Sequence, residues 1–178
     1  MSARYVFVDR DGTLVADRGY VHRIEDYRLL PGAAAGLLRL QEAGFAIAIV
    51  TNQSGIGRGH YSEADFQRFQ DHLVADLAAQ GVAIAASYHC PHRPDEGCAC
   101  RKPGTALLER ARDELGADLS ASWVIGDQPS DLELARRAGC RAVYVQSGQG
   151  SERRAEPPGE IASASDLVAA AKLVLAER

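Results

Sequence analysis

The stretch YVFVDRDGT, residues 5–13, brings four consecutive apolar residues directly up to an aspartate. An unbroken apolar run of this length is typical of a strand that is covered on both faces of a sheet. Such a strand delivers the Asp9 carboxylate at its carboxyl end. The same pattern returns in FAIAIV (45–50), which ends at Thr51, and in SWVIGD (122–127), which ends in Asp127. Two further runs complete a set of five predicted strands, at 82–90 and 141–148.

Segments with a helical spacing of apolar residues separate or follow these strands, at 29–44, 62–79, 103–116, 129–139 and 163–177. Pro31 fits the first turn of the first helix, and Gly44 fits its end. Ser62 with Asp65 predicts a capping box, and a serine is expected to cap the last helix.

The alternation of strands and helices predicts an α/β fold, a doubly wound parallel sheet in a single domain over residues 1–178. Residues 149–160 are polar, with a proline pair, and are predicted to form a loop. The intervals 12–30 and 52–62 leave no room for a large cap domain, so the site should be open.

The composition indicates a globular protein: 178 residues, 46% apolar, 25% charged, with a net charge of −4. This charge gives no basic surface for nucleic acid, so any phosphate binding is expected to be local. No apolar run approaches the length of a membrane span, and the first residues do not resemble a signal peptide. We therefore expect a cytoplasmic protein, acting as a monomer, with no nucleic-acid or membrane partner.

Polar residues gather just beyond the predicted strand ends, where ligands bind in open parallel sheets. Taken singly, each has an ordinary interpretation: an aspartate before glycine suits a turn, and one at a helix start suits a cap. Together they predict a Mg²⁺ site for a phosphoryl group, because several carboxylates at one edge need a cation. The residues are Asp9, Asp11, Thr51, Asn52, Lys102, Asp127 and Asp131.

Three of the four cysteines fall within CPHRPDEGCAC, residues 90–100. The pattern C-x-H-x₅-C-x-C offers a Cys₃His set, typical of a closed structural Zn²⁺ site. The predicted ligands are Cys90, His92, Cys98 and Cys100, with His89 as the rival imidazole. A redox pair is less favoured, because the tightest pair is C-x-C. Arg101 and Lys102 follow at once, so we interpret the loop as a clip that fixes two cations over the substrate.

These residues carry a resemblance to a known family. DRDGT resembles the first signature of the haloacid dehalogenase (HAD) phosphohydrolases, VTNQ the second, Lys102 the third and GDQPSD the fourth. TNQSGIGRG followed by the cysteine loop and RKP resembles the D-glycero-D-manno-heptose-1,7-bisphosphate 7-phosphatases. Histidinol-phosphate phosphatases share this layout.

The resemblance implies a Rossmann-like HAD fold and an aspartyl-phosphate mechanism, with Asp9 as nucleophile and Asp11 as general acid and base. Mg²⁺ would be held by the Asp9 carboxylate, the Asp11 carbonyl and Asp127. Thr51 and Lys102 would stabilise the phosphoryl group. The implied substrate-binding residues are Asp17, Arg18, Gly19, Tyr20, Asn52, Gln53, Ser54, Arg101 and Gln128, the last standing where these enzymes usually have lysine.

The resemblance implies removal of the 7-phosphate of a heptose 1,7-bisphosphate, with histidinol phosphate or another phosphomonoester as alternatives. Two rival classes are disfavoured. A signalling receiver domain would carry its acceptor aspartate at a mid-chain strand end, where this chain has Thr51. A zinc-loop module that binds nucleic acid would show a basic, aromatic face, whereas aromatic residues make up only 6% of the chain.

Overall fold

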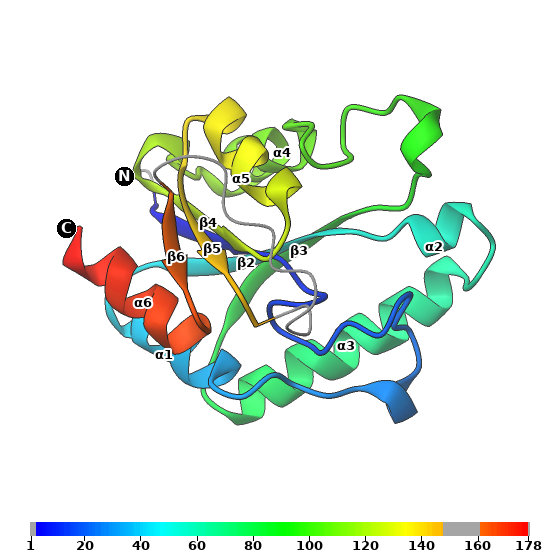
Figure 1. The fold of residues 1–178 in the computed structure, drawn as a ribbon, viewed down its shortest axis with the longest axis horizontal. Coiled ribbons are helices and arrows are strands. Elements are labelled where there is room, and N and C mark those ends of the chain that lie inside the picture. Colours follow the sequence, from blue (N-terminus) through cyan, green and yellow to red (C-terminus); the bar gives the residue numbers. More distant parts are fainter. Residues whose placement is uncertain (1–2, 148–160, 178) are drawn as a thin grey trace.

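The computed structural model describes residues 3–147 and 161–177, which form a parallel sheet between two layers of helices (Figure 1). The sheet has six strands in the order β3-β2-β1-β4-β5-β6, and every described pairing is parallel. The strands are β1 (Tyr5–Val8), β2 (Ala46–Asn52), β3 (Ile84–Cys90), β4 (Trp123–Gly126), β5 (Arg141–Val145) and β6 (Ala162–Ala164). The prediction of a doubly wound α/β fold is confirmed.

Helices cover both faces of the sheet. On one face lie α1 (Ala33–Glu42), α3 (Glu63–Ala79) and α6 (Leu167–Ala176), and on the other α4 (Ala106–Leu115) and α5 (Pro129–Ala138). Alternate residues of β1 serve the two layers, with Val6 and Val8 in one core and Phe7 in the other. Burial on both faces explains why the strands read as unbroken apolar runs.

Short helical turns occupy parts of the connections: α2 (Ser54–Gly57), η1 (Ile24–Asp26), η2 (Pro94–Glu96) and η3 (Leu119–Ala121). None of the described connections contains a further domain, in keeping with the prediction that a large cap is absent. Within the described ranges, no helix is both long and apolar enough to cross a membrane.

Of the five predicted helix starts, those of α3 and α5 agree with the structure, whereas α1, α4 and α6 begin later; α4 begins at Ala106 rather than 103. Ser62 and Asp65 form the predicted capping box of α3, with the Ser62 hydroxyl accepting from the Asp65 amide at 3.1 Å. The first helix begins at Ala33 rather than 29, because Gly32 takes a left-handed conformation at φ 78°. Pro31 therefore precedes the helix instead of lying in its first turn.

The last helix also begins later than predicted. Asp166, not a serine, caps α6, and its Oδ1 accepts from the Ala169 amide at 2.8 Å. Part of the segment expected to be helical forms β6, which pairs with β5. Three small residues carry no periodic signal, so this strand was not predicted. The predicted loop at 149–160 lies outside the described residues.

The topology brings the polar strand ends together. From β1 the chain builds towards β2 and β3, then crosses to β4, so the order of strands reverses between β1 and β4. Val8 pairs with Ile49 on one side and Ile125 on the other, which aligns the three strand ends. Ligands of doubly wound sheets bind at this reversal point, beyond the carboxyl ends.

Candidate active site

A buried lysine lies at the carboxyl edge of the sheet, where it pairs with an aspartate just after β1 and with another in the first turn of α5. The Lys102 Nζ lies 2.9 Å from the Asp9 Oδ1 and 2.6 Å from the Asp131 Oδ1, and it donates to the Val50 carbonyl at 3.0 Å. The side chain of Lys102 is 3% exposed, and those of its two carboxylate partners are 7% and 1% exposed. Three acceptors thus satisfy the three N–H groups of the ammonium.

The charge of this cluster is unbalanced. Asp9, Asp127 and Asp131 can place carboxylate oxygens within 4.8 Å of one another, against the single ammonium of Lys102. Burial, with repulsion from Asp131 and Asp127, raises the pKa of Asp9, although Lys102 opposes this. Burial and Asp131 raise the pKa of Asp127 to about 6. A divalent cation held by carboxylate oxygens would relieve the repulsion, so the residues fit Mg²⁺.

Two glycines allow this close packing of carboxylates. Gly12 has φ 84°, and a Cβ placed there would lie 2.3 Å from the Asp127 Oδ2. A Cβ on Gly126 would lie 2.2 Å from the Asp131 Oδ2. Any side chain at either position would displace a carboxylate from the site.

Asp11 lines the pocket, and buried residues of the protein bind its carboxylate. Its side chain is 22% exposed, and its two oxygens accept from the Arg10 Nε at 2.8 Å and the Arg10 Nη2 at 3.0 Å. The Gln53 amide donates to the Asp11 Oδ2 at 2.9 Å. The Asp11 carboxylate stays outside the acidic group formed around Lys102.

The residues after β2 are held by the protein itself. Asn52 exchanges two hydrogen bonds with the backbone of Lys102, at 3.0 and 3.3 Å, and so fixes the lysine's main chain to the sheet. Gln53 is 2% exposed, and protein groups occupy both ends of its amide. The Thr51 hydroxyl accepts from that amide at 2.9 Å and also faces the pocket.

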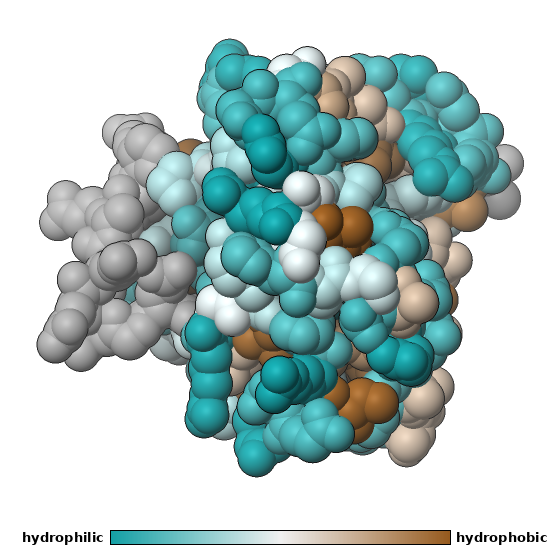
Figure 2. Space-filling model, turned by 90° about the vertical axis from the view of Figure 1, so that its right-hand side faces the viewer, coloured by the Kyte–Doolittle hydropathy of each residue, from teal (hydrophilic) through white to brown (hydrophobic). Residues whose placement is uncertain are grey.

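A pocket of about 580 Å³ opens above these residues, at the edge of the molecule where the strands end. Figure 2 shows that this side of the molecule is predominantly hydrophilic. The lining residues are Asp9, Asp11, Asp17, Gly19, Tyr20, Thr51, Asn52, Gln53, Ser54, Tyr61, Arg101, Lys102, Gln128 and Ser130. Of the predicted site residues outside the cysteine loop, Arg18, Asp127 and Asp131 are absent from the lining. Asp127 and Asp131 are buried.

The rim of the pocket is formed by residues that are more exposed. Tyr20 is 45% exposed and takes a left-handed φ of 53°, in a turn where the Asp17 carboxylate accepts from the Gly19 amide at 2.8 Å. A positive φ is uncommon for a tyrosine, and such conformations gather at ligand sites. Gln128 also lines the pocket, and its side-chain amide donates to the Asp127 Oδ2 at 3.2 Å.

The four predicted ligands of the cysteine loop converge. The Cys90 Sγ lies 3.6 Å from the Cys98 Sγ and 3.3 Å from the Cys100 Sγ. The His92 Nδ1 lies 3.5 Å from Cys90 and 3.2 Å from Cys100. Zn–S bonds of about 2.3 Å place tetrahedral sulfur ligands roughly 3.8 Å apart, so this Cys₃His group fits zinc. The rival His89 lies on β3 and pairs with Glu63 at 2.6 Å.

The cysteine loop is tied to the pocket at both ends. At its start, the Cys90 carbonyl accepts from the backbone amide of Gln53 at 2.7 Å, and the Pro91 carbonyl accepts from the backbone amide of Gly57 at 2.9 Å. At its end, Arg101 lines the pocket and donates to the His92 carbonyl at 3.5 Å. These hydrogen bonds tie the cysteine loop to the α2 turn and to the chain that enters the pocket, and the interpretation of the loop as a clip stays a prediction.

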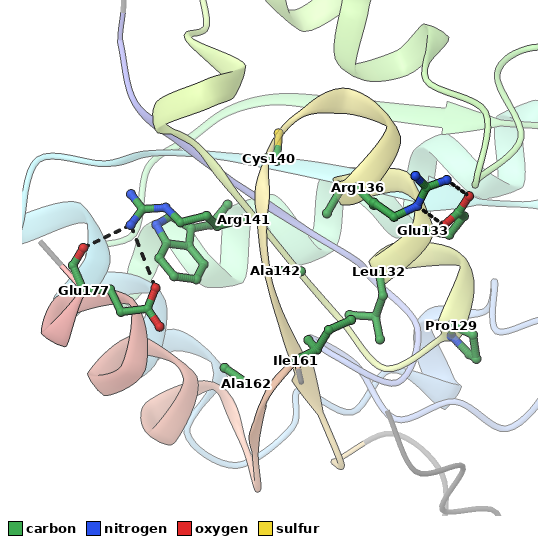
Figure 3. Close-up of a pocket in the computed structure, with 12 residues that line it drawn as sticks. Pro129, Leu132, Glu133, Arg136, Cys140, Arg141, Ala142, Ile161, Ala162 and Glu177 are labelled. Atoms are coloured by element: carbon green, nitrogen blue, oxygen red, sulfur yellow. Dashed lines mark hydrogen bonds and ion pairs between the residues drawn. The ribbon is translucent and has the colours of Figure 1, made fainter. Parts of the chain in front are cut away.

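A second cavity, of about 570 Å³, lies between α5, β5 and the C-terminal helix (Figure 3). Its charged side chains pair with one another: Arg136 with Glu133 at 2.7 Å, and Arg141 with Glu177 at 3.9 Å. It holds neither of the metal-type clusters found in the described residues. We therefore assign the chemistry to the first pocket.

Several contributors were not among the predicted site residues. Arg10 and Tyr61 support Asp11 and Gln53, and the Thr13 hydroxyl donates to the Asp127 Oδ1 at 3.4 Å. Asp131, by contrast, was predicted both as a member of the Mg²⁺ group and as a cap; it accepts from the Gln128 backbone amide at 3.1 Å and also binds Lys102. The GDQPSD motif marks Asp131, whereas nothing in the sequence marks Tyr61.

Known proteins resemble this chain over its whole length. The HAD-hydrolase-like family model matches residues 99–171. The chain is 36% identical to the D-glycero-beta-D-manno-heptose-1,7-bisphosphate 7-phosphatase of Pseudomonas aeruginosa, over 98% of this chain and 99% of that protein. It is 35% identical to the D-glycero-alpha-D-manno-heptose-1,7-bisphosphate 7-phosphatase of Photorhabdus laumondii, over 96% of each.

Among solved structures, the D,D-heptose 1,7-bisphosphate phosphatase from B. bronchiseptica, complexed with magnesium and phosphate, superimposes with a TM-score of 0.89. That match has 32% identity and covers 98% of this chain and 99% of that one. The fold and the site thus define a phosphatase among the HAD-like hydrolases. Within that class, the chain belongs to the family of D-glycero-D-manno-heptose-1,7-bisphosphate 7-phosphatases.

Proposed function

We propose that the protein, as a single domain, removes the 7-phosphate of D-glycero-D-manno-heptose 1,7-bisphosphate through an aspartyl-phosphate at Asp9. The observation that carries this proposal is the ammonium of Lys102, 2.9 Å from the Asp9 carboxylate at the floor of an open polar pocket. A fixed cation there can balance charge on the phosphoryl oxygens as the bond to Asp9 forms.

The reaction proceeds in two displacements. An Asp9 oxygen attacks phosphorus, the bond from phosphorus to the sugar oxygen breaks, and Asp11 gives its proton to the departing alkoxide. Asp11 then takes a proton from water, whose oxygen attacks phosphorus and releases Asp9 and inorganic phosphate. Thr51 and Lys102 donate to the phosphoryl oxygens in both steps.

Two metals have matching donor sets. Asp9, Asp127 and the Asp11 carbonyl would hold Mg²⁺, which screens the anionic nucleophile from the anionic phosphate. Cys90, His92, Cys98 and Cys100 would hold a structural Zn²⁺. In this role zinc fixes the chain that leads into Arg101 and Lys102.

The rim of the pocket is assigned to the sugar. The lining residues assigned to it are Asp17, Gly19, Tyr20, Ser54, Arg101 and Gln128. Because relatives named for the alpha and the beta anomer are about equally similar to this chain, the rim is where preference for one anomer has to arise.

The test is release of inorganic phosphate with and without Mg²⁺ from both heptose 1,7-bisphosphate anomers, histidinol phosphate and other sugar phosphates. Mg²⁺-dependent turnover that is fastest on one heptose bisphosphate supports the proposal. Asp9→Asn serves as the matched inactive control. Equal or faster turnover of histidinol phosphate would replace the proposed substrate.

A further inference from the structure

Arg10 lies between Asp9 and Asp11, at the variable position of the D-x-D motif, and its environment is unusual for a charged residue. It is fully buried, with its guanidinium 4.7 Å from the ring centroid of Phe69 and 5.5 Å from that of Phe66. Burying a guanidinium is costly unless it is paired. Arg10 is not among the residues that line the pocket, so its charge must serve an interaction inside the protein.

That interaction is a two-point contact with Asp11. The Arg10 Nε donates to the Asp11 Oδ1 at 2.8 Å and the Nη2 to the Oδ2 at 3.0 Å. The Nη2 also donates to the Val21 carbonyl at 2.8 Å, which anchors the guanidinium itself. Two parallel N–H groups fix the plane of a carboxylate, whereas a single donor leaves it free to rotate.

Gln53 closes the arrangement from the other side. Its Oε1 accepts from the Tyr61 hydroxyl at 2.6 Å and the Arg10 Nη2 at 3.2 Å, and its Nε2 donates to the Asp11 Oδ2 and the Thr51 Oγ1, both at 2.9 Å. All four bonding positions of the amide are used. Gln53 can thus hold its neighbours but has no capacity left for a substrate in this arrangement.

We propose that Arg10 is the positioning residue of Asp11: together with Gln53 and Tyr61, it holds the carboxylate in one orientation facing the pocket. The proposal rests on the proposed role of Asp11 in proton transfer. Arg10 touches no reacting atom and acts only through Asp11. A carboxylate displaced by about 1 Å from a proton-transfer geometry loses of the order of 10²-fold in rate.

Arg10→Lys tests this directly, because lysine keeps the charge but lacks the two-point donor. The backbone of the loop should survive, since the Arg10 carbonyl, not its side chain, accepts from the Leu14 and Val15 amides at 2.8 and 3.0 Å. Two substrates are compared with Mg²⁺ saturating: heptose 1,7-bisphosphate, whose alkoxide must be protonated, and p-nitrophenyl phosphate, whose leaving group needs no proton.

For heptose bisphosphate, kcat/KM should fall by about 10²-fold. For the aryl phosphate, kcat/KM reports formation of the aspartyl-phosphate and should change less than about 3-fold, whereas kcat should fall because water attack needs Asp11. Rapid mixing should then show a burst approaching one nitrophenolate per enzyme. A purely structural role would lower kcat/KM for both substrates alike and give no burst, and that result would overturn the proposal.

Arg141→Lys is the matched control. Arg141 also stacks on an aromatic ring, 4.4 Å from the centroid of Trp123, but it lies on the second cavity (Figure 3). This variant should leave kcat/KM unchanged for both substrates. If Arg10→Lys does not fold, Tyr61→Phe tests the proposal instead. The loss of one donor to Gln53 should lower kcat/KM for heptose bisphosphate, relative to kcat/KM for the aryl phosphate, by about 3- to 10-fold. No change in this ratio would overturn the proposal.

Failure of the proposed function would look different. A wild-type protein that hydrolyses the aryl phosphate but not the heptose bisphosphate contradicts the substrate, while the burst in Arg10→Lys still decides the role of Arg10. A wild-type protein with no phosphatase activity contradicts both.

Discussion

Replacing Lys102 with methionine should weaken both the fold and the chemistry, and a second substitution separates the two losses. At 2.6 Å from Asp131 and an effective dielectric constant of about 20, Coulomb's law gives roughly 6 kcal/mol of gross attraction. Desolvation of the two buried charges offsets most of it. Removing one partner leaves the other charge buried and unpaired, which costs about 3–5 kcal/mol.

Lys102→Met leaves two carboxylates, Asp9 and Asp131, without their ammonium partner, and the double variant Lys102→Met/Asp131→Asn removes the charge of one of them. We expect it to regain about 1–3 kcal/mol relative to Lys102→Met alone, since residues in one buried network couple by this amount. Activity should not return with stability, because the donor to the phosphoryl group is still missing; loss of one such donor costs about 10²–10³-fold in kcat.

The assays are urea unfolding with a chelator, so that no divalent cation stabilises the folded state, and Mg²⁺-dependent phosphate release at about pH 8, where free carboxyls are ionised. A double variant that is no more stable than Lys102→Met would show that the Lys102–Asp131 contact is not energetically coupled. Folded Lys102→Met with near-wild-type kcat would refute the role assigned to the lysine.

Four further outcomes are expected. Asp9→Asn should fold but not turn over, as checked by circular dichroism beside phosphate release; near-wild-type kcat would contradict the nucleophile. Zinc should co-purify at about one equivalent, and Cys98→Ser should lose it, with kcat/KM falling by about 10²-fold on heptose bisphosphate and by less on an aryl phosphate; full activity without zinc would exclude the clip. Because only the ionised carboxylate of Asp127 binds Mg²⁺, and its pKa is raised to about 6, the half-saturating Mg²⁺ concentration should rise as the pH falls through that value; a flat profile would argue against this ligand. Gln128→Lys should reorder the sugar phosphates more than it changes aryl phosphate hydrolysis; an unchanged order would mean that the residue does not face the sugar.

The sequence predicted the layout of the sheet and of the main carboxylates because both depend on strand ends. An apolar run that stops at a polar residue marks where a buried strand leaves the core, so Asp9, Thr51 and Asp127 could be placed at one edge. The cysteine cluster was predictable for a similar reason: its ligands lie within a single loop, and their spacing alone limits the geometry.

Contacts between distant segments could not be predicted in this way. Tyr61 reaches Gln53 only because the α2 turn folds back, and the aromatic rings around Arg10 come from α3. A helix cap and an ion-pair partner look alike in sequence, so the second role of Asp131 became visible only with Lys102 beside it. The short strand β6 escaped because its pairing with β5, not its composition, makes it a strand.

The unequal burial of the pocket has a consequence for how such a protein can diverge. The carboxylates assigned to phosphoryl transfer pack directly against glycines that leave no space for a side chain. Any substitution of Gly12 would therefore displace the Asp127 carboxylate. Tyr20, by contrast, is 45% exposed on the pocket lining, where Gly19 beside it has no atom within 4 Å of an added Cβ. Duplicated copies of the gene could therefore accept new sugars by altering the rim alone, while the floor is inherited intact.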